Sequence, residues 1–357
     1  MLVVLCCAST LLWSQTPVKQ EAGDPLRLPG VRVRTAADAP ILAVAARESL
    51  VLAVGLRGVI LRSEDGGASF ASVEEPVGVD LTGVVIVGHE RAFAVGQRGV
   101  VLRSDDAGRH WRMVLDGPHV KSLIGAQGQA ANPSGSDLAA QSASRVDTWP
   151  LFDADFVDMN HGVVAGAFGL LLRTEDGGET WQDVSATLGD ASASHLYGLR
   201  SVDGALFLVG ERGLIRWRPS GSPRFQPLTS PYRGSWFGLA TGQGTLLVFG
   251  MRGNAYTSRD GGRSWRPLKT GTQASLVVGL LLDDGSPVLV AQNGEVLWGE
   301  AGADSLQRLQ APALPYTSAA VAVGRDGRRK LVLGALSGGL KVLPLPAKPA
   351  STHSTKP

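Results

Sequence analysis

The chain has 357 residues, with 34 Lys and Arg against 32 Asp and Glu, 46 Gly and 2 Cys. Hydrophobic residues at 44% and charged residues at 18% exclude an intrinsically disordered chain, and a net charge of +2 excludes a bulk polycation for nucleic acid. Glycine is close to 13% (46 of 357), against about 7% in ordinary proteins. Without a collagen period, this excess predicts many tight turns and therefore many short strands.

An apolar run, Leu2–Trp13, stands near the N-terminus and is followed by polar Ser14–Pro17. It is shorter than the roughly 20 residues that span a bilayer and has the length of a signal-peptide core. We expect a signal peptide over residues 1–15, no membrane span in the mature chain, and an exported protein, periplasmic or otherwise extracytoplasmic (the thylakoid lumen in a photosynthetic host). Cys6 and Cys7 both lie in this segment. The other interpretation is a buried N-terminal strand.

A short motif recurs seven times along the rest of the chain. Its clearest copies are VGLRGVILRSEDGGASF (Val54–Phe70), VGQRGVVLRSDDAGRHW (Val95–Trp111) and AGAFGLLLRTEDGGETW (Ala165–Trp181). Degenerate copies start at Val209, Phe249, Val290 and Leu333. The second positions of the seven copies lie 41, 70, 44, 40, 41 and 43 residues apart; they are Gly55, Gly96, Gly166, Gly210, Gly250, Ala291 and Gly334. Apart from one long interval, this is the period of a propeller blade, about 40 to 45 residues.

Each unit is expected to form four strands, here called a to d. In the first unit they are predicted at 41–46, 50–55, 59–63 and 69–73, because short apolar, β-branched runs alternate there with glycine-containing turns. A glycine before strand c supplies the positive φ that the tight b–c turn needs. The positions are Gly58, Gly99, Gly169, Gly213, Gly253 and Gly294.

Seven such sheets predict an all-β fold, a seven-bladed β-propeller of four-stranded antiparallel blades over residues 26–345. The seventh unit lacks a strand d, and Leu26–Val33 is expected to supply it and close the ring. The long interval holds an insertion, residues 117–150, that is rich in Gly, Ala, Ser and Gln and is expected to be a flexible loop. Residues 346–357 are expected to form a disordered tail.

Four copies carry an Asp-box, Ser/Thr-x-Asp-x-Gly-x-Thr/Ser-aromatic, at the c–d turn, with His110 at the hydroxyl position of the second. We expect a structural role, in which the carboxylate accepts backbone N–H bonds and the ring packs beside the hairpin. Four scattered equivalents cannot all belong to one active site. The residues are Ser63, Asp65, Gly67 and Phe70; Ser104, Asp106, Gly108 and Trp111; Thr174, Asp176, Gly178 and Trp181; and Ser258, Asp260, Gly262 and Trp265.

An Asp-box coupled to a preceding VG-x-x-G-x-x-LR resembles the repeat of the Ycf48/Hcf136 family of photosystem II assembly factors. The match is best in the third unit, Phe156–Trp181, and covers roughly residues 26–345. The resemblance implies a non-enzymatic, extracytoplasmic propeller that binds a membrane-protein complex or its subunit during assembly. The partner would be a photosystem, or an envelope transporter in a non-photosynthetic host. We expect a monomer without cofactor, metal or nucleic-acid partner.

The b–c turns carry a recurring arginine, at Arg57, Arg98, Arg212 and Arg252. In a propeller these turns emerge on one face together with the d–a connections, so the four side chains are expected to ring one end of the axial channel beside the insertion. Guanidinium groups there can capture carboxylates of an acidic peptide by bidentate pairing. The alternative is that they are merely solvated. A second column, Arg62, Arg103 and Arg173 on strand c, is predicted to be structural.

Two other functions stay open. A sialidase-like glycoside hydrolase would use a tyrosine such as Tyr256, although the arginine triad and the nucleophile pair of that class are not recognisable. A carbohydrate-binding lectin would use exposed aromatics such as Trp149 or Trp236. The acidic cluster Asp153/Asp155/Asp158 resembles a cation loop but is expected to be structural, and the six histidines show no metal-ligand spacing.

Overall fold

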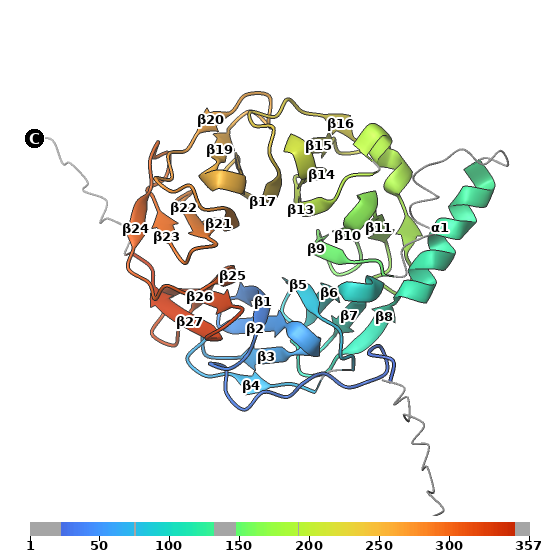
Figure 1. Ribbon diagram of the computed structural model, residues 1–357, viewed down its shortest axis with the longest axis horizontal. Helices are drawn as coiled ribbons and strands as arrows, with labels where there is room; N and C mark the ends of the chain where they lie inside the picture. Colours follow the sequence, from blue (N-terminus) through green and yellow to red (C-terminus); the bar gives the residue numbers. More distant parts are fainter. Residues whose placement is uncertain (1–22, 75, 132–147, 192, 347–357) are drawn as a thin grey trace, which may run out of the picture.

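The computed structural model describes residues 23–74, 76–131, 148–191 and 193–346. Within them, seven antiparallel sheets are set around a central axis as the blades of a propeller (Figure 1). Six sheets have four strands and one has three. The seven-bladed, all-β fold predicted from the repeat is confirmed.

The first four blades follow the chain, and each sheet keeps its strands in sequence order. Blade one holds β1 (Ile41–Arg47), β2 (Leu50–Gly55), β3 (Ile60–Ser63) and β4 (Ala71–Ser72). Blade two holds β5 (Leu81–Val87), β6 (Arg91–Gly96), β7 (Val101–Ser104) and β8 (Arg112–Leu115). Blade three holds β9 (Leu151–Phe156), β10 (Gly162–Gly166), β11 (Leu171–Thr174) and β12 (Gln182–Asp183). Blade four holds β13 (Leu196–Val202), β14 (Ala205–Gly210), β15 (Ile215–Arg218) and β16 (Gln226–Pro227).

The last three blades repeat this order. Blade five holds β17 (Trp236–Gly242), β18 (Thr245–Gly250), β19 (Ala255–Ser258) and β20 (Arg266–Pro267). Blade six holds β21 (Leu276–Leu281), β22 (Pro287–Ala291), β23 (Val296–Trp298) and β24 (Gln307–Leu309). Blade seven holds β25 (Tyr316–Val323), β26 (Arg329–Ala335) and β27 (Leu340–Pro344). The described helices are α1 (Gly117–Ala131) and six 3-10 segments, Leu56–Gly58, Gln97–Gly99, Ala167–Gly169, Ser185–Ala191, Glu211–Gly213 and Met251–Gly253.

The core lies between neighbouring blades. Strand β2 is buried along nearly its whole length, because one face packs on the preceding blade and the other on the following one. Leu52 and Ile60 of blade one thus share a cluster with Leu81 and Leu102 of blade two. This two-sided burial explains why strand b reads as a continuous apolar run rather than an alternating one.

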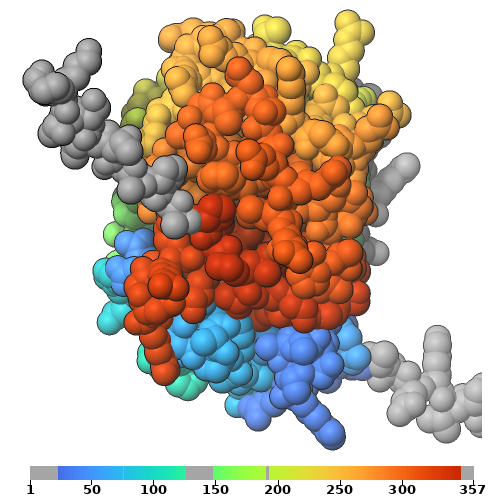
Figure 2. Space-filling model, turned by 90° about the vertical axis from the view of Figure 1, so that its left-hand side faces the viewer, coloured from blue at the N-terminus to red at the C-terminus, as the bar shows by residue number. Residues whose placement is uncertain are grey.

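The ring closes by packing of the last blade on the first. Strand β1 lies beside β25, and Thr317 Oγ1 donates a hydrogen bond to Ile41 O (2.8 Å). Figure 2 shows this contact from outside, with blade seven in red directly against blade one in blue. The contact is the same kind of inner-strand packing that joins the other blades, so closure needs no exchanged strand.

The prediction that Leu26–Val33 supplies the fourth strand of blade seven is wrong. None of these residues is in a strand, and Val31 N–H donates to Arg57 O of blade one (3.0 Å). Pro29 has no N–H to give to a sheet ladder, which disfavours strand pairing here. The segment reaches blade seven only further on, where Ala36 O accepts a hydrogen bond from Leu340 N–H (3.2 Å).

The insertion, expected to be a loop over 117–150, begins as helix α1, which projects from the rim of the ring (Figure 1). Asp116 accepts a hydrogen bond from His119 N–H (3.0 Å) and so caps the first turn. Val120 is fully buried, and Leu123 and Ile124 pack on the same cluster. Apolar residues three and four positions apart are the helical signal that the overall composition concealed. Residues 132–147 lie outside the described part.

Two expectations fall on the termini. The signal peptide over 1–15 and the tail beyond Pro346 lie outside the described residues. Among the residues that the structure does describe, no helix has the length and apolar character needed to cross a membrane.

Candidate functional site

The Asp-boxes brace their own hairpins. In blade one, Asp65 accepts hydrogen bonds from Ser63 Oγ (2.7 Å), Ser69 N–H (2.9 Å) and Ser69 Oγ (2.6 Å), while Gly67 N–H donates to Ser63 Oγ (3.0 Å). Burial by itself would raise the pKa of Asp65, but these donors together outweigh it and hold the pKa at about 2. The carboxylate is thus kept ionised and fully engaged inside its own turn.

The other three boxes repeat this pattern. Asp106, Asp176 and Asp260 each accept from the hydroxyl two residues before and from the backbone N–H four residues after. In blade two, His110 Nδ1 takes the place of the second hydroxyl, 2.6 Å from Asp106 Oδ2. The aromatic residue covers the turn, as where Trp111 Nε1 donates to Gly108 O (3.1 Å). This geometry stabilises hairpins and offers no carboxylate that is free for chemistry.

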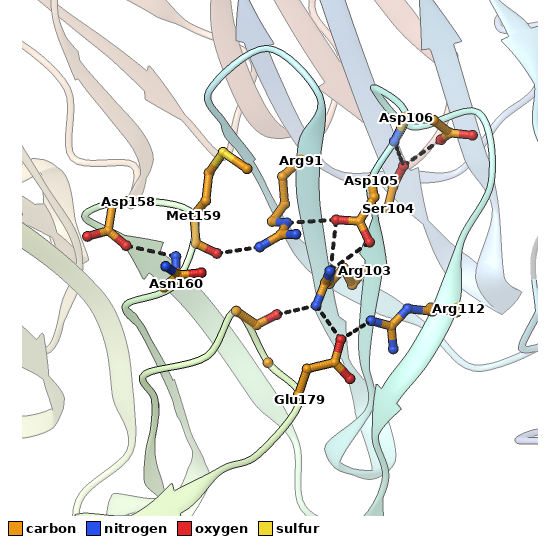
Figure 3. A network of polar contacts seen from close by, with 12 residues as sticks. Arg91, Arg103, Ser104, Asp105, Asp106, Arg112, Asp158, Met159, Asn160 and Glu179 are labelled. Atoms are coloured by element: carbon orange, nitrogen blue, oxygen red, sulfur yellow. Dashed lines mark hydrogen bonds and ion pairs between the residues drawn. The ribbon is translucent and has the colours of Figure 1, made fainter.

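The strand-c arginines join neighbouring blades (Figure 3). Arg103, 8% exposed, donates to Gly177 O (2.9 Å) and to Glu179 (2.8 Å) in the c–d turn of blade three, and it also pairs with Asp105 of its own blade. In the same way Arg62 Nε donates to Ala107 O of blade two (2.7 Å). These contacts lie within the protein and support a structural role.

The b–c turn arginines stand at an unfavourable backbone position. In blade one Val59 N–H donates to Leu56 O (3.2 Å), and both central residues have positive φ, 55° at Arg57 and 77° at Gly58, as in a type I′ turn. The φ values at Arg98, Arg212 and Arg252 are 59°, 52° and 56°. For residues other than Gly, Asn or Asp, this left-handed conformation costs about 1–2 kcal/mol. The backbone conformation of the turn therefore does not explain why arginine recurs there.

All of these turns lie on one face of the ring. A Cβ added to Gly58 would stand 1.9 Å from Val77 O, and one added to Gly253 would stand 2.0 Å from Thr272 O, so each turn rests on the connection that leads to the next blade. The start of the insertion lies there too, because a Cβ at Gly117 would be 2.9 Å from Arg98 O. We call this side, with the b–c turns, the turn face.

The four arginines differ in their surroundings. Arg57, Arg212 and Arg252 are exposed. Arg98 is half-buried and pairs with Asp24 Oδ1 at 3.4 Å. Blades three, six and seven carry Phe168, Asn293 and Leu336 at the corresponding places.

A ring of β-bulges surrounds the channel on the turn face. In every blade the pairing of the innermost strand shifts at its second residue, which is left without a partner. A bulge re-aims its side chain, and Thr82 in blade two accordingly donates to Leu151 O of blade three (2.6 Å). In blades three, four and five the bulged residue is aromatic: Phe152, Tyr197 and Phe237.

These rings are the core of an aromatic arc, by which we mean Phe152, Phe168, His195, Tyr197 and Phe237. Successive ring centroids are 4.8 Å apart for Phe168 and His195, 5.6 Å for Phe152 and Tyr197, and 5.7 Å for Tyr197 and Phe237. Phe168 is 42% exposed, has a φ of 55°, and its N–H donates to His195 Nδ1 (3.0 Å). The sequence reasoning missed this arc; aromatic residues at equivalent positions of three consecutive repeats were the available signal.

The channel contains ionisable groups. Inner strands of several blades enclose a cavity of about 350 Å³ that contains Asp153, Asp155 and Arg200. Arg200 Nη1 pairs with Asp153 (2.6 Å), and Asp155 accepts Ser201 N–H (2.6 Å). Burial raises the pKa of Asp155. No group of metal ligands was found in the described part of the chain, and Asp158 turns away to cap Asn160 and His161.

The aromatic residues named for a lectin do not form a sugar platform. Trp236 is fully buried, with Nε1 donating to Ser230 Oγ (3.0 Å), and Trp149 is 5% exposed in the core between blades two and three. The prediction that they are exposed is wrong, because Trp236 begins inner strand β17 and Trp149 lies two residues before inner strand β9, and both pack in hydrophobic clusters. Tyr256 packs edge-on against Trp236, with 5.8 Å between the ring centroids.

The fold and the braced turns define the class of this protein, an Asp-box β-propeller. Residues 141–296 match the family described as Photosynthesis system II assembly factor YCF48. The photosystem II assembly lipoprotein Ycf48 of Synechococcus sp. (strain CC9902) is 26% identical over 170 residues, which are 44% of this chain and 51% of that protein. The match thus spans about half the length of this curated relative.

Solved structures show the same architecture. YCF48 bound to D1 peptide has a TM-score of 0.61 at 16% identity over 89% of this chain and 96% of its own, and YCF48 from Cyanidioschyzon merolae has 0.60 at 16% over 88% and 98%. An ancestral GH74 enzyme scores 0.63 at 11% identity over 88% of this chain and 46% of its own. At these identities the likeness concerns the fold alone. In sequence the chain is similar to the YCF48 family over residues 141–296, and in structure it shares the propeller fold.

Proposed function

We propose that this protein is a non-enzymatic, extracytoplasmic binding protein that holds an acidic segment of a membrane-complex subunit on its turn face. The observation that carries the proposal is the repeated placement of arginine at a backbone position that costs stability. Strain that recurs at equivalent sites on one face is typical of function rather than of folding. A duplicated repeat free of such a role would be expected to carry Asn or Gly there.

The aromatic arc indicates which side chains the bound segment has beside its carboxylates. It lies on blades three to five, beside the arginine turns of blades four and five, and Tyr197 and Phe237 are only half-buried. Arginine and aromatic side chains are the residues that most often dominate protein interfaces. We therefore propose a ligand segment with carboxylates next to an aromatic or aliphatic side chain.

The comparisons support a partner of this kind. One similar structure is of YCF48 bound to a D1 peptide, and the curated relative is a photosystem II assembly lipoprotein. For this chain we propose a subunit of a membrane complex, of photosystem or transporter type, and an exported, monomeric protein.

Asparagine substitution tests the site without adding strain. The variant Arg57→Asn, Arg98→Asn, Arg212→Asn and Arg252→Asn removes four charges, and Asn adopts the left-handed region more readily than Arg or Ala. We expect unchanged or slightly higher thermal stability. If two of the arginines engage carboxylates at about 1.5 kcal/mol each, affinity falls about 100-fold.

Binding is measured by fluorescence anisotropy with overlapping D1-derived peptides and by capture from solubilised envelope. The control variant removes four exposed arginines from the opposite face: Arg259→Gln, Arg263→Gln, Arg325→Gln and Arg328→Gln. It has the same net charge as the test variant and should bind normally. Equal loss in both variants would refute a specific site and leave only bulk electrostatics, and no loss in the test variant would refute the arginine assignment.

A further inference from the structure

One strand-c arginine lacks the contact that its equivalents make. Arg62 and Arg103 each reach the c–d turn of the following blade, the first at Ala107 O (2.7 Å) and the second at Gly177 O (2.9 Å) and the Glu179 carboxylate (2.8 Å). Among the described residues, Arg173, the equivalent residue of blade three, binds only within its own blade, to Glu175 (3.2 Å) and Gln182 (3.1 Å). Its buried Nε has no hydrogen-bond partner in the described structure.

The cause lies in the sequence of blade four. Where blade three has the turn Glu175–Thr180, EDGGET, blade four has Pro219–Arg224, PSGSPR, with no acidic residue. Pro223 stands at the position of Glu179 in the aligned repeat. Arg173 therefore lacks the turn contact that Arg62 and Arg103 make, and it also lacks the carboxylate that Glu179 gives Arg103.

A cavity occupies the corresponding place. It measures about 230 Å³, lies between blades three and four on the face opposite the turn face, and is lined by Arg173, Arg218, Ser201 and His161 among others. Arg218, the last residue of β15, lies 5.5 Å from the centre of the Phe225 ring and forms no ion pair with a described carboxylate. Burial, and next the charge of Arg173, lower the pKa of Arg218, as expected for a partly buried cation beside a second cation.

The acidic groups at this cavity are already engaged. Glu175 pairs with Arg173 (3.2 Å), and Asp155 accepts Ser201 N–H (2.6 Å). His161 pairs with Asp158 at 2.8 Å. None of these acidic groups pairs with Arg218, so its positive charge is not compensated by them.

We propose that this cavity, the carboxylate slot, binds a carboxylate of an acidic peptide segment between Arg173 and Arg218, in the place that Glu179 takes beside Arg103. The incoming segment completes the interblade contact that blade four lacks. The slot lies away from the four turn arginines, so it is a second binding site and does not depend on the function proposed above.

The chain supplies its own probe. A synthetic peptide of residues Glu175–Thr180, acetylated and amidated at its ends, carries the turn that is missing from blade four. We expect saturable binding of this peptide to the full chain by isothermal titration, and weaker binding of free acetate. Phosphate is titrated as an oxyanion that is not a carboxylate. If phosphate bound and neither the peptide nor acetate did, the assignment of the cavity to a carboxylate would be overturned.

Two variants locate the site by opposite means. Arg218→Gln removes one of the two cations of the slot, and peptide affinity should fall at least about tenfold, because one charge-assisted contact is lost. Pro223→Glu installs a carboxylate from within, and it should block the peptide while raising the melting temperature. The variant Arg57→Asn, Arg98→Asn, Arg212→Asn and Arg252→Asn is the control and should bind this peptide as the unaltered protein does.

The result that overturns the proposal is peptide affinity unchanged in both Arg218→Gln and Pro223→Glu, or no saturable binding of peptide or acetate to the unaltered chain. Because Pro223→Glu is expected to stabilise the fold, its loss of binding cannot be ascribed to unfolding. Failure of the four-asparagine variant to lose D1-peptide binding would count against the turn face and not against the carboxylate slot.

Discussion

Arg103 offers the sharpest test of how the blades are held together (Figure 3). We consider Arg103→Met, which keeps the aliphatic stem and removes the guanidinium. The side chain is 9% exposed, whereas its partners Asp105 and Glu179 are 44% and 54% exposed. Loss of the guanidinium therefore lets the two carboxylates rehydrate, while Gly177 O, which accepts from Arg103 across the interface between two blades, has no such replacement.

The magnitude follows from these contacts. An unpaired buried carbonyl costs about 1–3 kcal/mol, and the two charge-assisted bonds to half-exposed carboxylates add about 1 kcal/mol in total. The sum is about 2–4 kcal/mol of unfolding free energy, or a fall of about 4–10 °C in melting temperature for a domain of this size. Differential scanning calorimetry at one scan rate measures it.

Arg112→Met is the matched control in the same network. Arg112 also contacts Glu179, but its side chain is 47% exposed and the contact spans solvent-facing groups. An exposed pair of this kind contributes less than about 1 kcal/mol. If Arg103→Met and Arg112→Met lowered the melting temperature equally, the argument from burial and the interblade carbonyl would be refuted.

Two further predictions concern carboxyl groups. The pKa of Asp65 is about 2, against 3.8 in an unstructured chain, and the side chain is only 7% exposed. This difference of 1.8 means that the ionised carboxylate contributes about 2 kcal/mol to the free energy of unfolding above pH 4. That contribution is lost as the pH falls through 2. Asp65→Asn should lower the melting temperature at pH 7 and have little effect near pH 2; a constant difference between the two pH values would contradict this. For Asp155 the pH dependence of stability has the opposite sign. Burial raises the pKa of this carboxyl group, so stability is lost as the pH rises through the raised pKa. Asp155→Asn, which can still accept the Ser201 N–H, should raise the melting temperature at pH 7 but not below pH 4, and a drop at pH 7 would sink the assignment.

Much of the fold was predictable because the same local sequence signals recur in each repeat. Strand β2 was predicted at its observed bounds, 50–55, and the glycine before strand c has the expected positive φ, 77° at Gly58. Strand β4 is shorter than the predicted 69–73, since the Asp-box turn holds Ser69 in its hydrogen bonds. Where one unit departs from the pattern, as at α1, composition alone was misleading.

The candidate site was only half predictable. Recurrence placed the turn arginines at equivalent positions of the blades, but nothing local reveals that they occupy left-handed backbone, or that the second residue of each inner strand is a bulge aimed around the channel. Trp149 and Trp236 show the same limit, since an aromatic residue in a strand carries no mark of which face is covered until neighbouring blades are assembled.

The sequence by itself determined the blade count, the strand order and the hairpin braces, because these depend on contacts within some 40 residues that each repeat contains. Tertiary structure decided how the ring closes, which aromatic rings meet in the arc, and why Arg173 lacks the contact of Arg62 and Arg103. Each of these depends on what a neighbouring blade presents, and that is settled only when the blades pack around the axis.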